Sequence, residues 1–431
     1  MEPGLSIFWF RRDLRLEDNK GLYAAVQSGN PVLPIFIFDE NIIDELARDD
    51  PRISFIYNTL REINNKLNEY GSSLVIIRGD PLSVIKDLVS RYNIKELHFN
   101  HDYEPYSISR DDEIREYLTA KGIGCYSHKD QVIFEKGEII KADNTPYTVY
   151  TPYKNKWLSN LNTNRHLTEY KIDPLALFRI KINFPGLEEF GFTISSIKVP
   201  DYDLEAVIDY EKTRNFPWIE GGTSKLGPHL RFGTVSVRQI INSLAGENSV
   251  FLNELIWREF FMQILYHFPD VVGENFRRKY DGINWRNNET EFVAWCKGET
   301  GIPLVDAGMR QLNQTGTMHN RIRMVVAGFL CKNLLIDWRW GEAYFAEKLL
   351  DYELSSNNGN WQWAAGTGCD AAPYFRVFNP KTQQEKFDKN YAYLNKWVPE
   401  LNTPDYPKPI VDHRYARNRA IEVYKQGIHN R

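Results

Sequence analysis

Short apolar runs alternate with longer amphipathic stretches over the first 135 residues. Five runs, at 5–10, 32–38, 74–77, 97–100 and 125–134, are nearly continuous, as is typical of strands buried on both faces of a sheet. Between them, 53–70 and 83–92 carry apolar residues at helical spacing. This alternation predicts an α/β N-terminal domain at 1–135, with a doubly wound, Rossmann-like parallel sheet. Such sheets bind ligands beyond the carboxyl ends of their strands, here at 11–16, 39, 78–80 and 100–106.

The pattern changes twice in the rest of the chain. Residues 136–205 are rich in Pro, Asn, Thr and Lys and show little periodicity, which predicts an interdomain linker that runs over the surface. Beyond residue 206, apolar residues recur at i, i+3 and i+4 in the segments 235–244, 251–268, 292–296, 304–312, 322–335 and 343–350. We therefore predict an all-α C-terminal domain at 206–431.

Composition excludes several classes of protein. The 431 residues are 42% hydrophobic and 26% charged, which is typical of a globular protein. No apolar run approaches the roughly 20 residues that cross a bilayer. The four cysteines, Cys125, Cys296, Cys331 and Cys369, lack the spacing of a zinc or iron–sulfur ligand set. We expect a cytoplasmic protein with no metal site and no membrane partner.

Charge and tryptophan are distributed unevenly. Residues 206–431 hold 28 Lys and Arg against 25 Asp and Glu, and they hold nine of the eleven tryptophans, although the net charge of the whole chain is −4. The negative total argues against a protein that coats nucleic acid in general. The second half is basic and rich in indole rings. This indicates that tryptophan has a particular function there, other than general coating of nucleic acid.

A glycine-rich segment at 221–227, Gly-Gly-Thr-Ser-Lys-Leu-Gly, comes just before a helical stretch. Adjacent glycines let backbone N–H groups converge, and two hydroxyls and a lysine add donors, so the segment suits a phosphate or diphosphate. A glycine-rich turn with a Thr or Ser N-cap explains the same residues, and local chemistry favours that plainer account.

Charged residues lie on an apolar helix at 253–259. Glu254, Trp257 and Arg258 share one helical face. A carboxylate beside an indole in apolar surroundings has a raised pKa and can donate a proton. An ion pair between Glu254 and Arg258 accounts for the spacing equally well.

Two segments further along combine arginines, carboxylates and tryptophans. Residues 319–324 include two arginines, and 351–353 include two carboxylates, which buried ion pairs without a catalytic role would also explain. Trp361 and Trp363 lie in a stretch of Ser, Asn and Gly. We expect that stretch to be a loop that stacks a flat ring, since its composition is a poor one for a core.

Taken together, these segments resemble the photolyase/cryptochrome flavoprotein family over nearly the whole chain. The match begins with Phe-Trp-Phe-Arg-Arg-Asp-Leu-Arg at 8–15 and runs in order to Phe-Asp at 387–388. Its specific pieces are Gly-Thr-Ser at 222–224, Asn-Glu-Leu-Ile-Trp-Arg-Glu at 253–259, Met-His-Asn-Arg-Ile-Arg-Met at 318–324, Asn-Asn-Gly-Asn-Trp-Gln-Trp at 357–363 and Asp-Ala-Ala-Pro-Tyr-Phe-Arg at 370–376. Within the family, the chain is similar to the class I cyclobutane pyrimidine dimer photolyases.

The resemblance implies a U-shaped, non-covalent FAD in the helical domain, active as reduced FADH−. The residues that it places along the phosphates and ribityl chain are Tyr210, Thr223, Ser224, Lys225, Leu226 and Gly227. Arg323 and Asp351 would pair beside the isoalloxazine with Glu353 nearby, where the best-known members carry Asp. Asn357 would face flavin N5, because a neutral amide can donate or accept a hydrogen bond.

The resemblance also implies light-driven repair of cyclobutane pyrimidine dimers in ultraviolet-damaged DNA, by electron transfer from excited FADH− to a dimer flipped out of the duplex. Trp257 and Trp363 would wall the dimer pocket, Asn320 and Met324 would touch the dimer, and Glu254 would stabilise its radical anion. The implied phosphate contacts are Arg214, Arg258, Arg321, Gln383 and Lys386. Contacts of this kind recognise the shape of the lesion more than the sequence around it.

Three tryptophans, Trp361, Trp338 and Trp285, match the family's electron-hopping chain, which photoreduces oxidised FAD. Packing between helices is a plainer role, and both roles are compatible. With Glu254 and Asn357, these tryptophans make up the catalytic residues that the resemblance implies.

Other functions compete with dimer repair. A cryptochrome-type blue-light photoreceptor would keep FAD and the tryptophan chain, but it would not need Trp257, Trp363 and Met324 together. A (6-4) photolyase characteristically has histidines where Asn320 and Met324 stand. A single-stranded nucleic-acid-binding module explains the basic bias but not the segment around Asn357. We therefore favour dimer repair, by a monomer.

The N-terminal domain corresponds to the family's antenna-type domain, but the resemblance leaves its chromophore open. Folate-using members tend to have an Asn-Glu pair in the loop after the fourth strand, where this chain has Glu-Pro-Tyr-Ser at 104–107. A deazaflavin, a flavin or no second chromophore at all are the alternatives.

Overall fold

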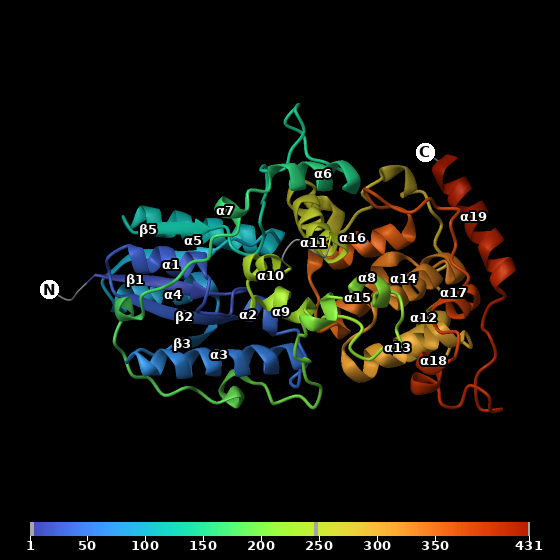
Figure 1. Cartoon of the computed structure of the whole chain (residues 1–431), viewed down its shortest axis with the longest axis horizontal. Helices are drawn as coiled ribbons and strands as arrows, with labels where there is room; N and C mark the ends of the chain where they lie inside the picture. Colours follow the sequence, from blue (N-terminus) through green and yellow to red (C-terminus); the bar gives the residue numbers. More distant parts are fainter. Residues whose placement is uncertain (1–3, 245–248, 430–431) are drawn as a thin grey trace. The chain divides into compact units, whose positions relative to one another are not determined.

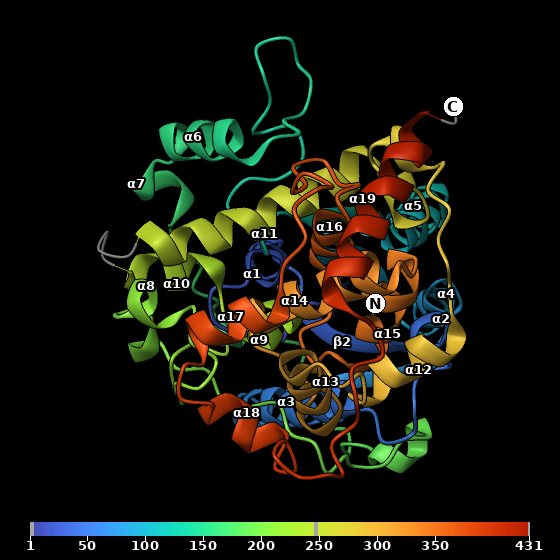
Figure 2. The same ribbon diagram turned by 90° about the vertical axis from the view of Figure 1, so that its right-hand side faces the viewer.

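The computed structural model describes residues 4–244 and 249–429, and the chain divides into two compact units. Unit 1 consists of Met1–Glu138, Trp157–Pro200 and Leu226–Glu247, and unit 2 of Ile139–Lys156, Asp201–Lys225 and Asn248–Arg431. The strands come from the blue and cyan N-terminal part of the chain, whereas the yellow to red C-terminal part is helical (Figure 1, Figure 2). The predicted fold class, an α/β part followed by an all-α part, is confirmed.

Unit 1 is built on a parallel sheet of five strands in the order β3-β2-β1-β4-β5. The strands are β1 (Leu5–Phe10), β2 (Val32–Asp39), β3 (Val75–Gly79), β4 (Ile94–Asn100) and β5 (Gly124–His128). In β1, Phe8 and Phe10 belong to one core cluster, while Ile7 and Trp9 belong to another. Because successive side chains of a strand point to opposite faces, both faces of β1 are buried, and its sequence is apolar without alternation.

Helices connect and cover these strands. They are α1 (Lys20–Gln27), α2 (Glu40–Ile43), α3 (Pro51–Glu69), α4 (Pro81–Arg91) and α5 (Pro105–Ala120), joined in unit 1 by α7 (Thr163–His166), α9 (Gly227–Phe232) and α10 (Val237–Ser243). The predictions at 53–70 and 83–92 are confirmed by α3 and α4. Periodicity missed α5, which buries the charged side chains of Arg110 and Asp111 instead of an apolar stripe alone. The strand predicted at 125–134 is wrong beyond His128, where the chain leaves the sheet.

The segment predicted as a linker at 136–205 contains helix α6 (Tyr150–Asn160) as well as α7. Two aromatic side chains of α6, Tyr153 and Trp157, are 1% and 0% exposed, so this part of the chain contributes to a core. The lack of periodicity did not indicate these helices. Short 3₁₀ turns lie at Pro174–Ala176, Leu187–Phe190, Glu205–Val207, Pro269–Val272 and Arg278–Tyr280.

The regular elements of unit 2 are helices in the part of the chain that the structure describes, apart from an isolated β-bridge between Ile140 and Pro146. Its helices are the part of α6 up to Lys156, α8 (Tyr210–Thr213), α11 (Ser249–His267), α12 (Glu289–Lys297), α13 (Pro303–Thr315), α14 (Asn320–Gly328), α15 (Trp338–Lys348), α16 (Leu354–Ala365), α17 (Pro380–Phe387), α18 (Ala392–Trp397) and α19 (His413–His429). The helix predicted at 322–335 is divided, since a π-helical turn, η6 (Phe329–Leu334), follows α14 and ends at Leu335 with φ +55°. Side chains of α12 to α16 form the main core cluster of this unit.

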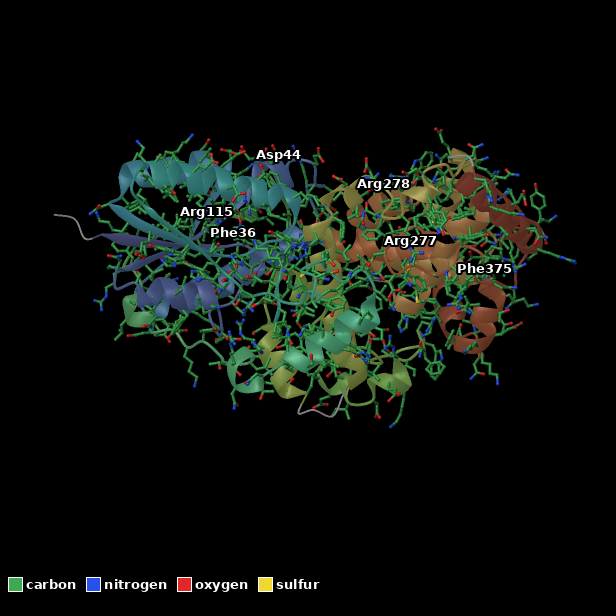
Figure 3. All side chains as sticks on the ribbon, turned by 90° about the horizontal axis from the view of Figure 1, so that it is seen from above. Phe36, Asp44, Arg115, Arg277, Arg278 and Phe375 are labelled. Carbon is green, nitrogen blue, oxygen red and sulfur yellow. The ribbon has the colours of Figure 1, made fainter. Side chains whose placement is uncertain are left out.

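Side-chain burial separates the interior of each unit from its surface (Figure 3). Phe36, labelled in that view, is 7% exposed inside unit 1, whereas the ring of Phe375 in unit 2 is 56% exposed. Among the described residues, no helix is long and apolar enough to cross a membrane. Nor does this part of the chain contain a group of three or more His, Cys, Asp or Glu side chains that could hold a metal ion.

A buried network of charges holds α10 in unit 1. Asp130 lies 2.6 Å from the guanidinium of Arg15 and 2.7 Å from that of Arg238, which also lies 2.9 Å from Asp18. Burial raises the pKa of Asp130, but the two arginines outweigh it and hold the pKa below its ordinary value. Each buried carboxylate of the network therefore faces a guanidinium group, which offsets the cost of burying it.

A second buried cation, Lys332 in unit 2, lacks such a partner. Its Nζ donates hydrogen bonds to Ala365 O at 2.6 Å and Tyr374 O at 3.3 Å, and it lies 3.8 Å from the ring centroid of Tyr424. In the described part of the chain no carboxylate lies within ion-pair distance of it. Burial lowers the pKa of Lys332 from 10.5 to about 7.

Replacing Arg238 with Met should destabilise the protein by about 3–5 kcal/mol, because Asp18 and Asp130 would each lose a cation while remaining buried. Denaturant unfolding followed by circular dichroism measures the change. The matched control is Lys66→Met, since Lys66 and Glu17 form an ion pair whose side chains are 54% and 70% exposed. The control should lower stability by less than about 1 kcal/mol. Equal losses in the two variants would contradict the role given to the network.

The depressed pKa of Lys332 predicts stability that rises with pH from about 7 to 10.5. In that range the unfolded chain keeps the proton on this lysine and the folded protein does not, so raising the pH favours the folded state. The variant Lys332→Met should lose this part of the pH dependence. Unfolding curves of both proteins at pH 7 and pH 9 test it, and parallel pH profiles would contradict it.

Candidate active site

Three helices of unit 2 carry most of the predicted site residues. Helix α16 packs against both α11 and α14, and α8 packs against α11. This packing brings together residues that are up to about 150 positions apart in the sequence. They are Arg214 at the end of α8; Glu254, Trp257 and Arg258 on α11; Asn320, Arg321, Arg323 and Met324 on α14; and Asn357, Trp361 and Trp363 on α16. Gln383 lies on α17 and is half-buried.

Glu254 forms an ion pair with Arg214 at 2.7 Å, and both side chains are about three-tenths exposed. Burial raises the pKa of Glu254, although Arg214 opposes the shift. The pKa of Tyr210 rises to about 12 because its phenol is buried and faces Glu254. Arg258 lies 3.8 Å from Glu353, so these residues do not form the Glu254–Arg258 pair that spacing alone also allowed.

An aromatic platform surrounds Trp257. Its ring stacks on Tyr150 with 3.6 Å between centroids and 6° between planes, and it packs against Phe261 at 5.4 Å. Tyr150 is fixed in turn, because its hydroxyl donates to Asn253 O at 2.8 Å and its backbone N–H donates to Asp370 at 3.1 Å. Sequence reasoning missed Tyr150, which begins α6 in the predicted linker. Trp257 itself is half-buried, and part of its surface stays exposed.

Arg321 is held in place without a carboxylate. It donates to the side chain of Asn215, and its guanidinium carbon lies 4.5 Å from the ring centroid of Phe387. Its Nε is buried with no hydrogen-bond partner among the described residues. Burial and the neighbouring Arg214 lower the pKa of Arg321, so the two arginines form a positive region with unused donors. Such a region favours an anion such as a phosphate.

The start of α14 keeps a neutral histidine beside these arginines. His319 caps the helix, with Nδ1 accepting a hydrogen bond from the backbone of Arg321 at 3.1 Å. Burial and the nearby Arg323, Arg321 and Arg214 lower its pKa to about 4. Asn320 follows on the exposed first turn, and Met324 lies one turn further, with its sulfur 3.8 Å from Arg321.

Arg323 and Asp351 form the predicted pair. Arg323 donates to the two carboxylate oxygens at 3.1 and 2.9 Å and to Met318 O at 2.7 Å. About a quarter of each side chain is exposed. The Arg323–Asp351 ion pair therefore lies at the edge of the core and is not fully buried. Glu353 is buried at the N-cap of α16, where it accepts a hydrogen bond from Ser356 at 3.1 Å.

Asn357 lies one turn into α16 and is buried. Its amide nitrogen donates to Glu342 Oε1 at 2.8 Å and to Glu342 O at 3.1 Å, and burial raises the pKa of that carboxyl. The nearby hydroxyl of Ser355 is buried without a hydrogen-bond partner among the described residues. A neutral amide, an unpaired hydroxyl and the Arg323–Asp351 pair fit the polar edge of a flavin ring, so the residues present are compatible with FAD.

The Ser/Asn/Gly stretch is a helix, α16, so the predicted loop is wrong. Its polar side chains satisfy backbone groups of a neighbouring turn, since Asn358 and Gln362 both donate to Val271 O, at 2.8 and 3.1 Å. Trp361 is 2% exposed and packs edge-on against Phe345 at 4.9 Å. It is therefore a core residue. Trp363 is half-buried, with Phe378 at 6.5 Å.

The three tryptophans of the predicted chain share one core. Trp361 and Trp338 belong to the main cluster of unit 2, and Trp285 packs against it while remaining half-buried. Trp338 is 0% exposed, and its indole N–H donates to Asn275 at 2.9 Å. Packing in the core therefore accounts for all three rings, and their use as an electron path stays a prediction.

The glycine-rich segment lies partly in each unit. In unit 2, Ser224 is buried and its carbonyl accepts from the backbone of Asp203 at 2.9 Å, while Lys225 is exposed with φ +53°. Leu226 and Gly227 belong to unit 1. Helix α9 has Leu226 at its N-cap and no side-chain cap, so the plainer account by a Thr or Ser cap is wrong. Tyr210 is half-buried beside Phe251, at 5.2 Å.

Comparison with known proteins identifies the family. Residues 6–172 match the family model described as DNA photolyase, and residues 251–404 match that of the FAD binding domain of DNA photolyase. A deoxyribodipyrimidine photo-lyase of Halobacterium salinarum is 36% identical, over 98% of this chain and 99% of its own. The crystal structure of a class III photolyase from Agrobacterium tumefaciens matches with a TM-score of 0.89 at 33% identity, covering 100% of this chain and 99% of that one. An archaeal photolyase from Sulfolobus tokodaii with two FAD molecules matches with a TM-score of 0.85 at 36% identity, covering 98% and 100%. The chain therefore belongs to the DNA photolyase family.

Proposed function

We propose that the protein is a deoxyribodipyrimidine photo-lyase that repairs cyclobutane pyrimidine dimers in ultraviolet-damaged DNA. The observation that carries the proposal is the arrangement around α11, where a carboxyl with a raised pKa, Glu254, lies beside the indole of Trp257 and an arginine pair. Full-length relatives with the same name, at 36% and 35% identity, support the same reaction. When bound, FAD in its reduced form supplies one electron on absorbing light.

The DNA side of the site receives a dimer flipped out of the duplex. Trp257 and Trp363 stack on or pack against its rings, and Asn320 and Met324 contact it from α14. The proposed phosphate ligands are Arg214, Arg258, Arg321, Gln383 and Lys386. Arg321 is suited to this because its half-buried guanidinium forms no ion pair with a carboxylate in the described residues. Guanidinium groups bind phosphates, as they bind carboxylates, through paired N–H donors.

Arg214 couples phosphate binding to the protonation of the Glu254 carboxyl. In the structure Arg214 lowers the pKa of Glu254, against the effect of burial. A DNA phosphate that takes over Arg214 removes this opposing charge, so the pKa of Glu254 rises further and the protonated carboxyl is favoured. A protonated Glu254 donates a hydrogen bond to a base carbonyl of the dimer. That bond strengthens as negative charge develops on the dimer.

The flavin side of the site is formed by a second set of residues. We assign Tyr210, Thr223, Ser224, Lys225, Leu226 and Gly227 to the phosphates and ribityl chain of FAD. Arg323, paired with Asp351, orients the ring, and Glu353 holds the guanidinium of Arg258 beside it. Asn357 presents a neutral amide to flavin N5. Because its nitrogen already donates both hydrogens to Glu342, the amide oxygen is the atom that would accept a hydrogen bond there. Trp361, Trp338 and Trp285 conduct electrons from the surface inward.

The remaining parts of the proposal rest on the resemblance. We propose that the protein acts as a monomer in the cytoplasm, with FADH− as the active form and a second, antenna chromophore in the α/β part. The Sulfolobus photolyase holds two FAD molecules, which implies a novel light-harvesting cofactor in that protein. One of the similar solved structures is a class III photolyase, so the choice of class I stays a prediction.

Illumination with ultraviolet-damaged DNA tests the function directly. The flavin-loaded, reduced protein should remove cyclobutane dimers in blue or near-ultraviolet light and leave them intact in the dark. The variant Glu254→Leu should lower repair per absorbed photon by about tenfold, because it loses one hydrogen bond to a group that becomes charged. Glu254→Gln keeps a donor and should retain most of the repair. A yellow protein that repairs no dimers would contradict the proposal.

Two substitutions separate the DNA and flavin roles. Arg321→Ala should weaken binding to damaged DNA and reduce the salt slope of the affinity by about one, while the flavin spectrum is unchanged. Asn357→Ala should shift flavin redox behaviour and leave DNA affinity within about threefold, since its amide faces the cofactor. Lys348→Ala, a surface change beside Glu347, is the control for both. Equal effects of the two variants on DNA affinity and on redox behaviour would show that the roles are wrongly assigned.

A further inference from the structure

A cavity of about 480 Å³ opens in unit 1 at the carboxyl ends of β4 and β5. Its wall includes His101, which follows β4, and His128, which ends β5. Helix α1 contributes Lys20, and the segments around α7 and α10 contribute Arg165 and Arg238. A volume of this size is that of a site for a small organic ligand. None of these residues is used in the repair reaction proposed above.

The cavity lies one strand away from the point where the strand order reverses, between β1 and β4. A doubly wound sheet ordinarily binds its ligand at that reversal, but here side chains fill it. Arg11 pairs with Asp111 at 2.5 Å, Asn100 donates to Asp13, and the space left among them is about 10 Å³. That space has room for a single water molecule. The larger space lies next to it, between the ends of β4 and β5.

The wall of the cavity has an excess of positive charge. Four cationic side chains line it against two carboxylates, Glu135 and Glu138. Lys129 pairs with Glu138 at 2.6 Å, and Arg238 is held by Asp18 and Asp130. The other two cations have no carboxylate within ion-pair distance in the ranges that the structure describes.

These two cations are Lys20 and Arg165. Burial lowers the pKa of Lys20, and the neighbouring Lys129 and Arg238 lower it further, as expected where positive charge is not neutralised. Glu135 does not offset this charge by contact, because its carboxylate accepts from His101 at 2.6 Å and from Tyr103 at 2.9 Å. Two unmatched positive charges at one cavity suit a dianion.

The rest of the wall is aromatic or apolar. Tyr170, His166 and His128 present rings, and Val132 and Ile133 present aliphatic side chains. Burial and nearby cations lower the pKa of His128 to about 4, so its imidazole is neutral near pH 7. The ammonium of Lys20 lies 5.8 Å from the ring centroid of Tyr170, which places a cation beside an aromatic surface. This combination favours a flat ring attached to an anionic group.

We propose that this cavity binds a phosphomonoester that carries a flat ring, with a mononucleotide as the simplest such compound. Lys20 and Arg165 bind the phosphate dianion. The ring lies against Tyr170 and the neutral imidazoles, and Val132 and Ile133 exclude water beneath it. Arg238 and Lys129 add positive electrostatic potential to the cavity but stay paired with their own carboxylates.

Calorimetric titration of the full-length, flavin-saturated protein tests this site, using AMP, adenosine and inorganic phosphate as probes. AMP should bind with one site per chain, more tightly than phosphate or adenosine, because only AMP offers both the dianion and the ring. Lys20→Met and Arg165→Gln should each weaken AMP binding by about tenfold or more, as expected for the loss of a charged hydrogen bond. Lys20→Arg keeps the charge and should retain binding within about threefold.

The control variant is Lys121→Met, an exposed lysine after α5 in the same unit, which should bind AMP like the parent protein. An unchanged flavin spectrum and circular dichroism signal show that each variant is folded. No binding of AMP, equal affinity for AMP and adenosine, or unchanged affinity in both cavity variants would overturn the proposal. Binding of a 5′-phosphorylated oligonucleotide without binding of AMP would also overturn it, because the site would then serve DNA ends.

Discussion

Unit 1 depends on one buried ionic constraint, the network in which Asp18 and Asp130 face Arg15 and Arg238. Burying any one of these charged side chains alone would cost much free energy. Together the two carboxylates and the two guanidinium groups balance their charges. Because Arg238 lies 108 positions after Asp130, the network joins α10 to the sheet despite the long sequence between them. The same arginine forms part of the wall of the cavity beside β4 and β5. A structural ion network therefore also shapes a space for a ligand.

Unit 2 uses ion pairs differently, since the two pairs among its predicted site residues are partly exposed. Arg214 with Glu254, and Arg323 with Asp351, each keep about a quarter of their side-chain surface accessible. A pair in contact with solvent contributes little to stability, and its members can exchange partners at small cost. Exchange is what the proposed DNA binding would demand of Arg214, whose guanidinium would leave the carboxylate of Glu254 for a phosphate. The fully buried network of unit 1 could not do this without unfolding.

The sequence predicts the fold class well and the details of the site unevenly. Strand β1 was readable because residues on both of its faces are buried, and α3 was readable because it has one apolar stripe. The sequence pattern did not indicate helix α6. It therefore also missed Tyr150, the residue on which Trp257 stacks. The positions of the site residues came from ordered motifs, but their pairing depends on which helices touch. Spacing alone could not show that Glu254 meets Arg214 instead of Arg258.

Close helix packing explains the composition that suggested a loop at α16. A Cβ built at Gly359 would come within 2.1 Å of the ring of Phe261 on α11, and one at Gly341 of α15 within 2.1 Å of the ring of Trp361. Any larger residue at either position would push α16 away from a neighbour. Small and amide side chains thus let three helices approach closely enough to bury Trp361 while Trp363, two positions on, stays half-buried. Since two residues along a helix turn the side chain by about 200°, one short helix can present an indole to the core and another to a bound ring.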